Sequence, residues 1–331
     1  MKSGIIFVNL GTPAAPNTSG VRQFLKQFLS DRRVVEVPRL LWLCILYGII
    51  LPFRSPRVAK AYQQIWMNDT SPLRYFSQRL VDGVASQVAE RYPNQEIELR
   101  LAMSYGSVSI SDTVDELLAA GCERLFFLPL FPQYSATTTA AVHDEISRVF
   151  SRRRDIPQWS WLRNYHNHPG YIEALAESVQ QYWDENGRGE RLLLSFHGIP
   201  KRNVDLGDPY QRHCEETAQA LATKLGLGDE EWQLSYQSRL GKAEWLQPYT
   251  DKTVIGLATS GVKKLDVLCP AFAVECLETI EEIDGEVHEY FTENGGEEFR
   301  YIPCLNDSEV HQNLMFLLSR SFIEEKTHLF S

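Results

Sequence analysis

The residues of this sequence best suited to chemistry are a histidine at the end of a predicted strand and a row of glutamates. His197 follows the run Leu192–Phe196 and precedes Gly198 and Pro200. The run is typical of a buried parallel strand, which the glycine and the proline would end. Because ligands of open α/β sheets bind where strands end, we expect His197 to face a binding site. A core histidine bonded to a nearby carbonyl would have the same local sequence.

The row of glutamates lies in the segment AFAVECLETIEEIDGEV at 271–287. Glu275, Glu278, Glu282 and Glu286 are three, four and four residues apart, so a helix would place them in one column. We predict a helix over 272–283 and a break at Asp284-Gly285. Like charges at this spacing cost about 0.2–0.5 kcal/mol per pair, so the column faces either water or a cation. The helix begins where a strand ends, as the His197 loop does, which predicts that both face one cleft.

An imidazole beside carboxylates indicates metal binding, proton transfer or both. This ligand set suits Fe²⁺, Zn²⁺ or Co²⁺, and histidine titrates near neutral pH. The sequence has no HExxH motif and no His/Cys tetrad, which argues against a closed structural zinc site. Two protein ligands with open coordination positions fit a site that passes a metal on.

Strands and helices alternate along the chain, which predicts α/β domains with parallel sheets. Short motifs recur in the same order in both halves, which predicts a duplicated unit with a cleft between the copies. The first set is NLGTP (9–13), SYGS (104–107) and LPLFP (128–132), and the second is FHGIP (196–200), SYQS (235–238) and LCPAF (268–272). In this alignment Leu10 takes the place of His197. We predict strands near 4–10, 97–103, 124–130, 159–163, 192–196, 232–236, 264–268 and 299–302, and helices near 21–29, 56–66, 73–92, 112–120, 138–150, 211–225, 252–260, 272–283 and 308–322.

The most hydrophobic stretch is LLWLCILYGIILPF at 40–53. A spanning helix needs about 20 apolar residues, so we expect this stretch not to cross a membrane. We predict that it forms either a buried helix or an apolar lip at the cleft mouth, in contact with a membrane or an apolar ligand. Basic residues on both sides favour interfacial contact: Arg32, Arg33, Arg39, Arg54, Arg57 and Lys60.

Composition excludes several classes of protein. The chain has 331 residues and a net charge of −10, which argues against a nucleic-acid partner. Its six cysteines form no CxxC pair, as expected in a reducing compartment. The N-terminal segment lacks the features of a signal peptide. Trp245, in a loop after a strand, is predicted as a hydrophobic plug or as an aromatic wall for a planar ligand.

Several of these motifs resemble the ferrochelatase family, the terminal enzymes of haem synthesis, and especially its enterobacterial forms. The segments that carry the resemblance are LSFHGIP (194–200), YQSRLGKAEWLQPYT (236–250), CPAFAVECLETIEEI (269–283), NLGTP, FLSDRRV (28–34), SPLRY (71–75) and LPLFPQYSATTT (128–139). The resemblance implies insertion of Fe²⁺ into protoporphyrin IX with release of two protons. It also implies two similar Rossmann-like domains of the class II chelatase type with the cleft between them. The implied domains are 1–160, with the lip at 40–53, and 161–305, followed by a C-terminal helix (306–331) that packs back on the first domain.

The resemblance also implies roles for individual residues. His197 and Glu278 would be the metal-binding and proton-transfer pair. Glu275, Glu282 and Glu286 would line an acidic path for metal or protons. The porphyrin would contact Leu10, Tyr105, Tyr134 and Trp245, and a propionate would meet Arg32 or Arg33.

The implied partners are protoporphyrin IX and Fe²⁺, which is a substrate, so we expect no resident cofactor. We predict no [2Fe–2S] cluster, because no cysteine follows Cys304 and Ala136 stands where some relatives have cysteine. Glu275 stands where many relatives have aspartate. We expect a cytoplasmic monomer with peripheral contact to the inner membrane.

Three alternatives remain open from the residues. A non-catalytic porphyrin or haem carrier would bind the ring without inserting metal. A chelatase for another metal or tetrapyrrole would need many basic residues in the cleft where the ring is rich in carboxylates. A nucleotide-binding transferase would need a GxGxxG motif or a P-loop, which the sequence lacks.

Overall fold

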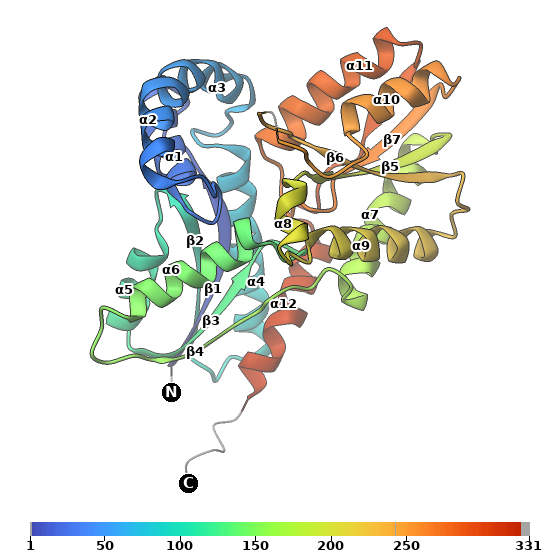
Figure 1. The fold of residues 1–331 in the computed structure, drawn as a ribbon. Helices are drawn as coiled ribbons and strands as arrows, with labels where there is room; N and C mark the ends of the chain where they lie inside the picture. Colours follow the sequence, from blue (N-terminus) through green and yellow to red (C-terminus); the bar gives the residue numbers. More distant parts are fainter. Residues whose placement is uncertain (1, 242, 326–331) are drawn as a thin grey trace.

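The computed structural model describes residues 2–241 and 243–325, which form two four-stranded sheets with the same strand order (Figure 1). The order is β2-β1-β3-β4 in the first sheet and β6-β5-β7-β8 in the second, and every neighbouring pair is parallel. This repetition confirms the predicted α/β fold of two similar units. The strands are β1 (Lys2–Thr12), β2 (Ile97–Gly106), β3 (Cys122–Pro129), β4 (Gln158–Trp161), β5 (Arg191–His197), β6 (Trp232–Gln237), β7 (Lys264–Leu268) and β8 (Glu298–Tyr301).

Helices cover both faces of the first sheet. Side chains alternate between the faces of a strand, so Phe7 of β1 packs with Leu80 in one core cluster, whereas Val8 packs with Val114 and Ile146 in another. The helices of this half are α1 (Thr18–Ser30), α4 (Pro72–Arg91), α5 (Ile110–Ala119) and α6 (Ala141–Phe150), the last preceded by a π-helical turn, η2 (Ala136–Ala140).

The second sheet is covered in the same way. Leu194 of β5 packs in the cluster that holds Leu221, and Leu193 packs with Val254 and Ile283. The C-terminal helix α12 (Glu309–Glu324) lies against α4 of the first half, where Gln87 Nε2 donates to Asn313 Oδ1 at 3.0 Å. The other helices are α7 (Pro169–Asn186), α8 (Lys201–Asp205), α9 (Tyr210–Leu225), α10 (Thr250–Thr259), the π-helix η3 (Glu278–Val287) and α11 (His288–Glu293).

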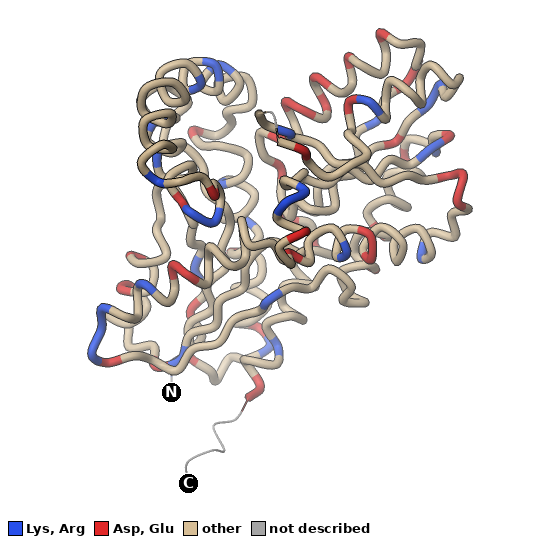
Figure 2. Tube along the Cα trace, viewed as in Figure 1, with Lys and Arg blue, Asp and Glu red and all other residues tan. Residues whose placement is uncertain are grey.

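The apolar stretch forms part of a continuous helical segment beside α1 (Figure 1), made of α2 (Arg39–Ile45), η1 (Leu46–Ile50) and α3 (Leu51–Ile65). Leu46 and Tyr62 are buried in a cluster with Val21 of α1. The outward face is open, with Leu40 83% and Phe53 77% exposed. The buried-helix alternative is therefore wrong, and the segment presents an apolar lip. Lys and Arg residues lie along α3 (Figure 2).

The length argument against membrane crossing is also wrong as stated, because the helix continues beyond the apolar run. The segment Arg39–Ile65 has 27 residues, and its most apolar window has a mean hydropathy of 1.3 with 17% of that window buried. By length and composition alone it is able to span a membrane. A core helix or a signal sequence passes the same test.

Candidate active site

His197 is the last residue of β5, where it pairs with Gln237 of β6. Its Nδ1 lies 2.6 Å from the carbonyl oxygen of Gly198. A carbonyl only accepts hydrogen bonds, so Nδ1 carries the hydrogen and the lone pair of the neutral ring is on Nε2. The half-buried imidazole therefore has its second nitrogen available to accept a proton or to bind a metal ion.

Gly198 and Trp245 determine the surroundings of His197. A Cβ atom on Gly198 would lie 2.8 Å from the carbonyl oxygen of Gln237 and 3.2 Å from Cε3 of Trp245. The backbone of Trp245 forms an isolated β-bridge with Pro200, and the indole Nε1–H donates to the carbonyl of Leu240 at 2.9 Å. Trp245 therefore lies beside the His197 loop, as the aromatic-wall alternative requires.

The glutamate helix begins later and ends later than predicted. It starts with η3 at Glu278 instead of Phe272, and it continues through Asp284-Gly285 into α11 as far as Glu293. Glu278, Glu282 and Glu286 therefore share one continuous helix, which carries acidic residues along its length (Figure 2). A π-helix of this length is rare, and such segments are frequent at functional sites.

Glu275 does not belong to the column, so its predicted place on the helix is wrong. Its buried carboxylate accepts hydrogen bonds from the amide of Cys304 at 2.8 Å, from the hydroxyl of Tyr301 at 3.0 Å and from the hydroxyl of Thr279. Burial raises the pKa of Glu275, and these hydrogen bonds oppose the shift. The hydroxyl of Thr279 also accepts a hydrogen bond from the amide of Cys276. These hydrogen bonds around Glu275 stand where the predicted helix would have its first turn.

Glu282 lies near both His197 and Glu278, because Gln237, the strand partner of His197, contacts Glu282 and the backbone of Glu278. The amide of Ser238 donates to Oε1 of Glu282 at 2.7 Å, and the serine hydroxyl donates to Oε2. Gln237 Nε2 donates to the backbone carbonyl of Glu278 at 2.8 Å. Burial raises the pKa of Glu282 and the charge of Glu278 adds to the rise, whereas Ser238 and the charge of His197 lower it. The structure thus brings the predicted pair and one path residue together.

A pocket of about 140 Å³ lies beside this group. Glu282 and Glu286 contribute to its wall, and Glu286 is exposed. Carboxylates therefore extend from the surface to the neighbourhood of His197. The remaining lining residues are Tyr236, Gln237, Ser238, Arg239, Tyr249, Thr250, Asp251, Val287 and Tyr290. Within residues 2–241 and 243–325, no group of three or more His, Cys, Asp and Glu side chains is arranged to hold a metal ion.

The lip contributes a cation that sequence reasoning did not assign to the site. Burial lowers the pKa of Arg54, at the start of α3, and the charge of Glu278 raises it. Burial likewise raises the pKa of Tyr62, and the charge of Glu278 raises it further. Helix α3 contacts the η3 helix, which agrees with these charge effects. The basic residues that follow the apolar run are the signal that places Arg54 here.

The predicted porphyrin contacts lie in different surroundings. Leu10 is half-buried at the edge of the apolar cluster that also receives Leu277 and Ile280 of the glutamate segment. Tyr105 is 8% exposed, and its hydroxyl donates to Asp31 Oδ2 at 2.7 Å. Tyr134 is half-buried, with the Arg163 guanidinium 4.2 Å from its ring centroid.

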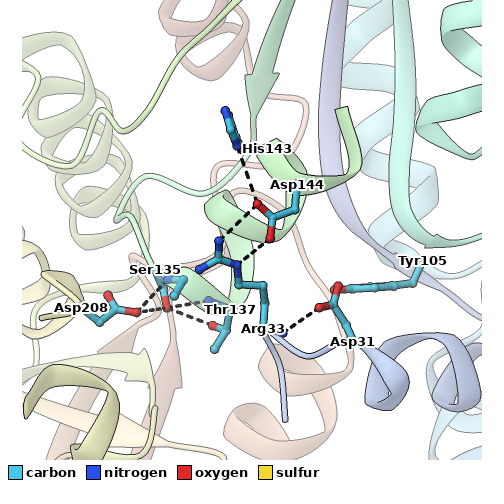
Figure 3. A network of polar contacts seen from close by, with 9 residues as sticks. Asp31, Arg33, Tyr105, Ser135, Thr137, His143, Asp144 and Asp208 are labelled. Atoms are coloured by element: carbon cyan, nitrogen blue, oxygen red, sulfur yellow. Dashed lines mark hydrogen bonds and ion pairs between the residues drawn. The ribbon is translucent and has the colours of Figure 1, made fainter. Parts of the chain in front are cut away.

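The two predicted propionate-binding arginines differ as well. Arg33 already holds a carboxylate, because its Nε and Nη2 atoms donate to Asp144 at 2.7 and 3.2 Å (Figure 3). The amide of Arg33 also donates to Asp31, so Asp31 joins Arg33 to Tyr105. Arg32 is exposed.

Solved structures with the same fold include a sirohydrochlorin chelatase. SirB from Bacillus subtilis, solved with Fe³⁺, matches with a TM-score of 0.59 and 13% identity, over 97% of this chain and 95% of that one. CbiX, described as the terminal enzyme of siroheme biosynthesis in denitrifying bacteria, matches with a TM-score of 0.51 and 12% identity, over 96% and 98%. The fold is therefore that of the class II chelatases.

Sequence comparison narrows this class to one family. The model of the ferrochelatase family matches residues 2–321. Ferrochelatase of Vibrio parahaemolyticus is 50% identical over 97% of this chain and 98% of its own length. Ferrochelatase of Aeromonas hydrophila is 50% identical over 96% of this chain and 97% of its own. The chain belongs to the ferrochelatase family.

Proposed function

We propose that this protein inserts Fe²⁺ into protoporphyrin IX, giving protohaem and two protons, as the names of its relatives indicate. The observation that carries the proposal is that Glu282 lies in the wall of an acidic pocket and close to both His197 and Glu278. Metal insertion needs a base for the two pyrrole N–H protons and an anionic surface that attracts Fe²⁺. The site supplies both kinds of group.

We assign the first proton acceptance to His197. Its Nδ1–H is engaged by the carbonyl of Gly198, which fixes the tautomer and leaves Nε2 as the basic atom. A proton taken up at Nε2 makes an imidazolium beside Glu282, whose carboxylate stabilises it. The same lone pair binds a metal ion when the ring is neutral, so protonation and metal binding at His197 exclude each other.

The carboxylates then have two tasks on one helix. We infer that Glu286, at the surface, and Glu282, in the pocket wall, attract the incoming cation and lead protons out. Glu278 lies near the start of α3, where the charge of Arg54 partly offsets its own. Glu275 is fully hydrogen-bonded inside the protein, so we assign it a structural role before the helix instead of a place on this path.

The porphyrin must be held and bent, because its nitrogen lone pairs have to project toward the metal. Binding energy from the periphery of the ring supplies this distortion. We propose that Trp245, Leu10 and Tyr134 contact the macrocycle, since each offers partly open apolar surface. Arg33 would have to exchange Asp144 for a propionate, whereas Arg32 has no such bond to break among the described contacts.

Metallation of porphyrin by the purified protein tests the proposal. Protein would be mixed anaerobically with protoporphyrin IX and Fe²⁺ or Zn²⁺, and the porphyrin absorption spectrum followed. We expect rapid conversion by the wild type and slower conversion by Glu282→Gln. Glu289→Gln, an exposed glutamate on the same helical segment, is the matched control and should retain wild-type rates. Porphyrin binding without conversion would instead identify a carrier, and conversion of sirohydrochlorin alone would identify a different chelatase.

We further propose that the lip rests on a membrane surface. The face formed by Leu46, Leu51 and Tyr62 is buried against α1, so crossing a bilayer would require these contacts to break. The opposite face exposes Leu40, Ile49 and Phe53, with basic residues at both ends. An apolar face flanked by cations suits an interface with anionic lipids.

Vesicle flotation tests this contact. The wild type should float with phosphatidylethanolamine–phosphatidylglycerol vesicles, and the double variant Leu40→Ser/Phe53→Ser should lose most of that binding. Leu206→Ser, which removes an exposed leucine far along the chain (65% exposed), is the control. Equal flotation of the two variants would contradict the assignment of the lip.

The remaining expectations are that the protein works as a cytoplasmic monomer, needs no resident cofactor and has the domain boundaries given above. Of the six cysteines, Cys44 is exposed and the other five are buried. Iron and acid-labile sulfide analysis of protein purified without air would test the prediction that it holds no cluster. Sedimentation equilibrium would test the monomer.

A further inference from the structure

Tyr134 follows a strand of the first sheet, yet its loop is fastened to the second half of the chain. The amide of Tyr134 donates to Nδ1 of His213 at 3.2 Å. One residue earlier, Gln133 Nε2 donates to Oγ1 of Thr217 at 3.1 Å. His213 and Thr217 both belong to α9, which packs on the second sheet.

A second attachment lies two residues further on. The amide of Ala136 donates to Oδ2 of Asp208 at 2.7 Å, and the hydroxyl of Ser135 donates to the same atom at 2.9 Å (Figure 3). Asp208 lies between α8 and α9. Its carboxylate faces the first turn of η2, where free amides and the helix dipole favour an anion. Loop 133–136 is thus bonded to the second half through four successive residues.

His213 is built to accept this hydrogen bond. Its ring is 2% exposed and is stacked on His166, with centroids 3.7 Å apart and planes at 4°. His166 is held in turn by Glu216, whose Oε2 lies 2.6 Å from its Nε2. Because the Tyr134 amide donates to Nδ1, that nitrogen must be unprotonated. Burial lowers the pKa of His213 to about 4, and His166 and Arg212 act in the same direction, so the ring stays an acceptor at neutral pH.

We propose that His213 is a positioning residue that fixes Tyr134 through its backbone amide, so that Tyr134 moves with the half that carries His197. The inference rests on the proposed function only in taking porphyrin as the ligand of Tyr134. Fixing the amide sets the direction of the side chain, and the Arg163 guanidinium over the ring completes its orientation. A porphyrin contact held in this way is fixed relative to the half of the chain that carries His197.

The test compares two substitutions of His213, one that keeps a hydrogen-bond acceptor for the Tyr134 amide and one that removes it. His213→Asn offers an amide oxygen near the place of Nδ1, whereas His213→Ala removes the acceptor. Losing a hydrogen bond of this kind costs a factor of about ten. We expect His213→Ala to raise the KM for protoporphyrin IX about tenfold with kcat within about twofold of the wild type. His213→Asn should restore most of that loss, and Gln219→Ala, exposed on the same helix, should change neither constant.

Hydrogen exchange in the absence of porphyrin separates this inference from the proposed function. The peptide that covers 131–137 should lose protection in His213→Ala and keep it in His213→Asn. Unchanged protection in His213→Ala would overturn the attachment. Lost protection with an unchanged KM, or with a change in kcat alone, would overturn its role in positioning Tyr134. If the wild type metallates no porphyrin, the affinity for protoporphyrin IX, from fluorescence quenching, replaces KM.

Discussion

Ser238 holds both oxygens of the Glu282 carboxylate, one through its backbone amide at 2.7 Å and the other through its hydroxyl. It does so from a left-handed backbone conformation with φ of 63°, which is uncommon for a residue other than glycine. The conformation turns the amide and the hydroxyl of one residue toward the same carboxylate. Backbone strain at a residue that donates two hydrogen bonds to a site carboxylate indicates that the position of Glu282 is important for function.

Removing the hydroxyl should therefore slow metal insertion without affecting porphyrin affinity. Hydrogen bonds to charged groups contribute about 1.5–3 kcal/mol, so we expect Ser238→Ala to lower kcat about tenfold. The dissociation constant for protoporphyrin IX, from fluorescence quenching, should stay within about twofold. Ser260→Ala, whose hydroxyl bonds to the Leu257 carbonyl at an exposed helix end, is the control. A wild-type rate in Ser238→Ala would show that Glu282 needs no such hold.

Gly198 should be the least replaceable residue of the His197 loop. A methyl group there would meet the Gln237 carbonyl at 2.8 Å and Trp245 at 3.2 Å. We expect Gly198→Ala to lower the free energy of unfolding by about 1–3 kcal/mol and to reduce metallation. Gly256→Ala provides the contrast, since nothing lies within 4 Å of the added atom inside α10. That variant should be about 0.5–1 kcal/mol more stable, as urea titration would measure, and equal stabilities would contradict the packing described.

Much of the fold follows from sequence patterns. The apolar runs at β1, β3, β5 and β7 are typical of central parallel strands, and the repeated motifs correctly predicted two sheets of equal topology. Helix α7 was missed, although its N-terminus carries a proline directly after a histidine cap. No helix is predicted for this segment, which connects the two halves of the chain.

The site was predictable in its residue types and less so in its geometry. His197 at a strand end follows from the glycine and proline after it. The start of η3 does not follow from spacing, because the hydrogen bonds of Glu275 to Tyr301 and Cys304 come from a strand and a loop about 30 residues later. Likewise, the contact of Tyr134 with His213 joins residues from the two halves, and no local pattern contains it.

Acid should destabilise the protein through its buried neutral histidines. Burial lowers the pKa of both His213 and His311 to about 4, whereas the ordinary value is 6.5. Below pH 6.5 these two histidines are protonated in the unfolded chain but remain neutral in the folded chain. Stability is therefore lost as the pH falls from 6.5 to about 4. Above pH 6.5 both histidines are neutral in the folded and unfolded chain, so they do not change the stability with pH.

The buried glutamates have the opposite effect on the pH dependence of stability. The contribution of His213 is therefore measured as the difference in unfolding free energy between the wild type and a His213 variant. The raised pKa values of Glu275 and Glu282 make the folded chain take up protons first as the pH falls toward 4.5. Urea unfolding of the wild type and of His213→Asn should be compared from pH 7.5 to 4.5. We expect the free energy of unfolding of the wild type, relative to that of His213→Asn, to decrease steadily below pH 6.5. An advantage that is constant with pH would show that His213 is protonated equally in both states.

The most direct test of the central claim is single-turnover metallation by His197→Ala and Glu278→Gln, with porphyrin affinity measured in parallel. A positioned general base contributes roughly 10²–10⁴-fold. The account predicts that both variants bind protoporphyrin IX within about threefold of the wild type and insert Fe²⁺ at least about 100-fold more slowly. Metallation at the wild-type rate by either variant would contradict the assignment of this pair as the proton acceptor and metal-binding centre.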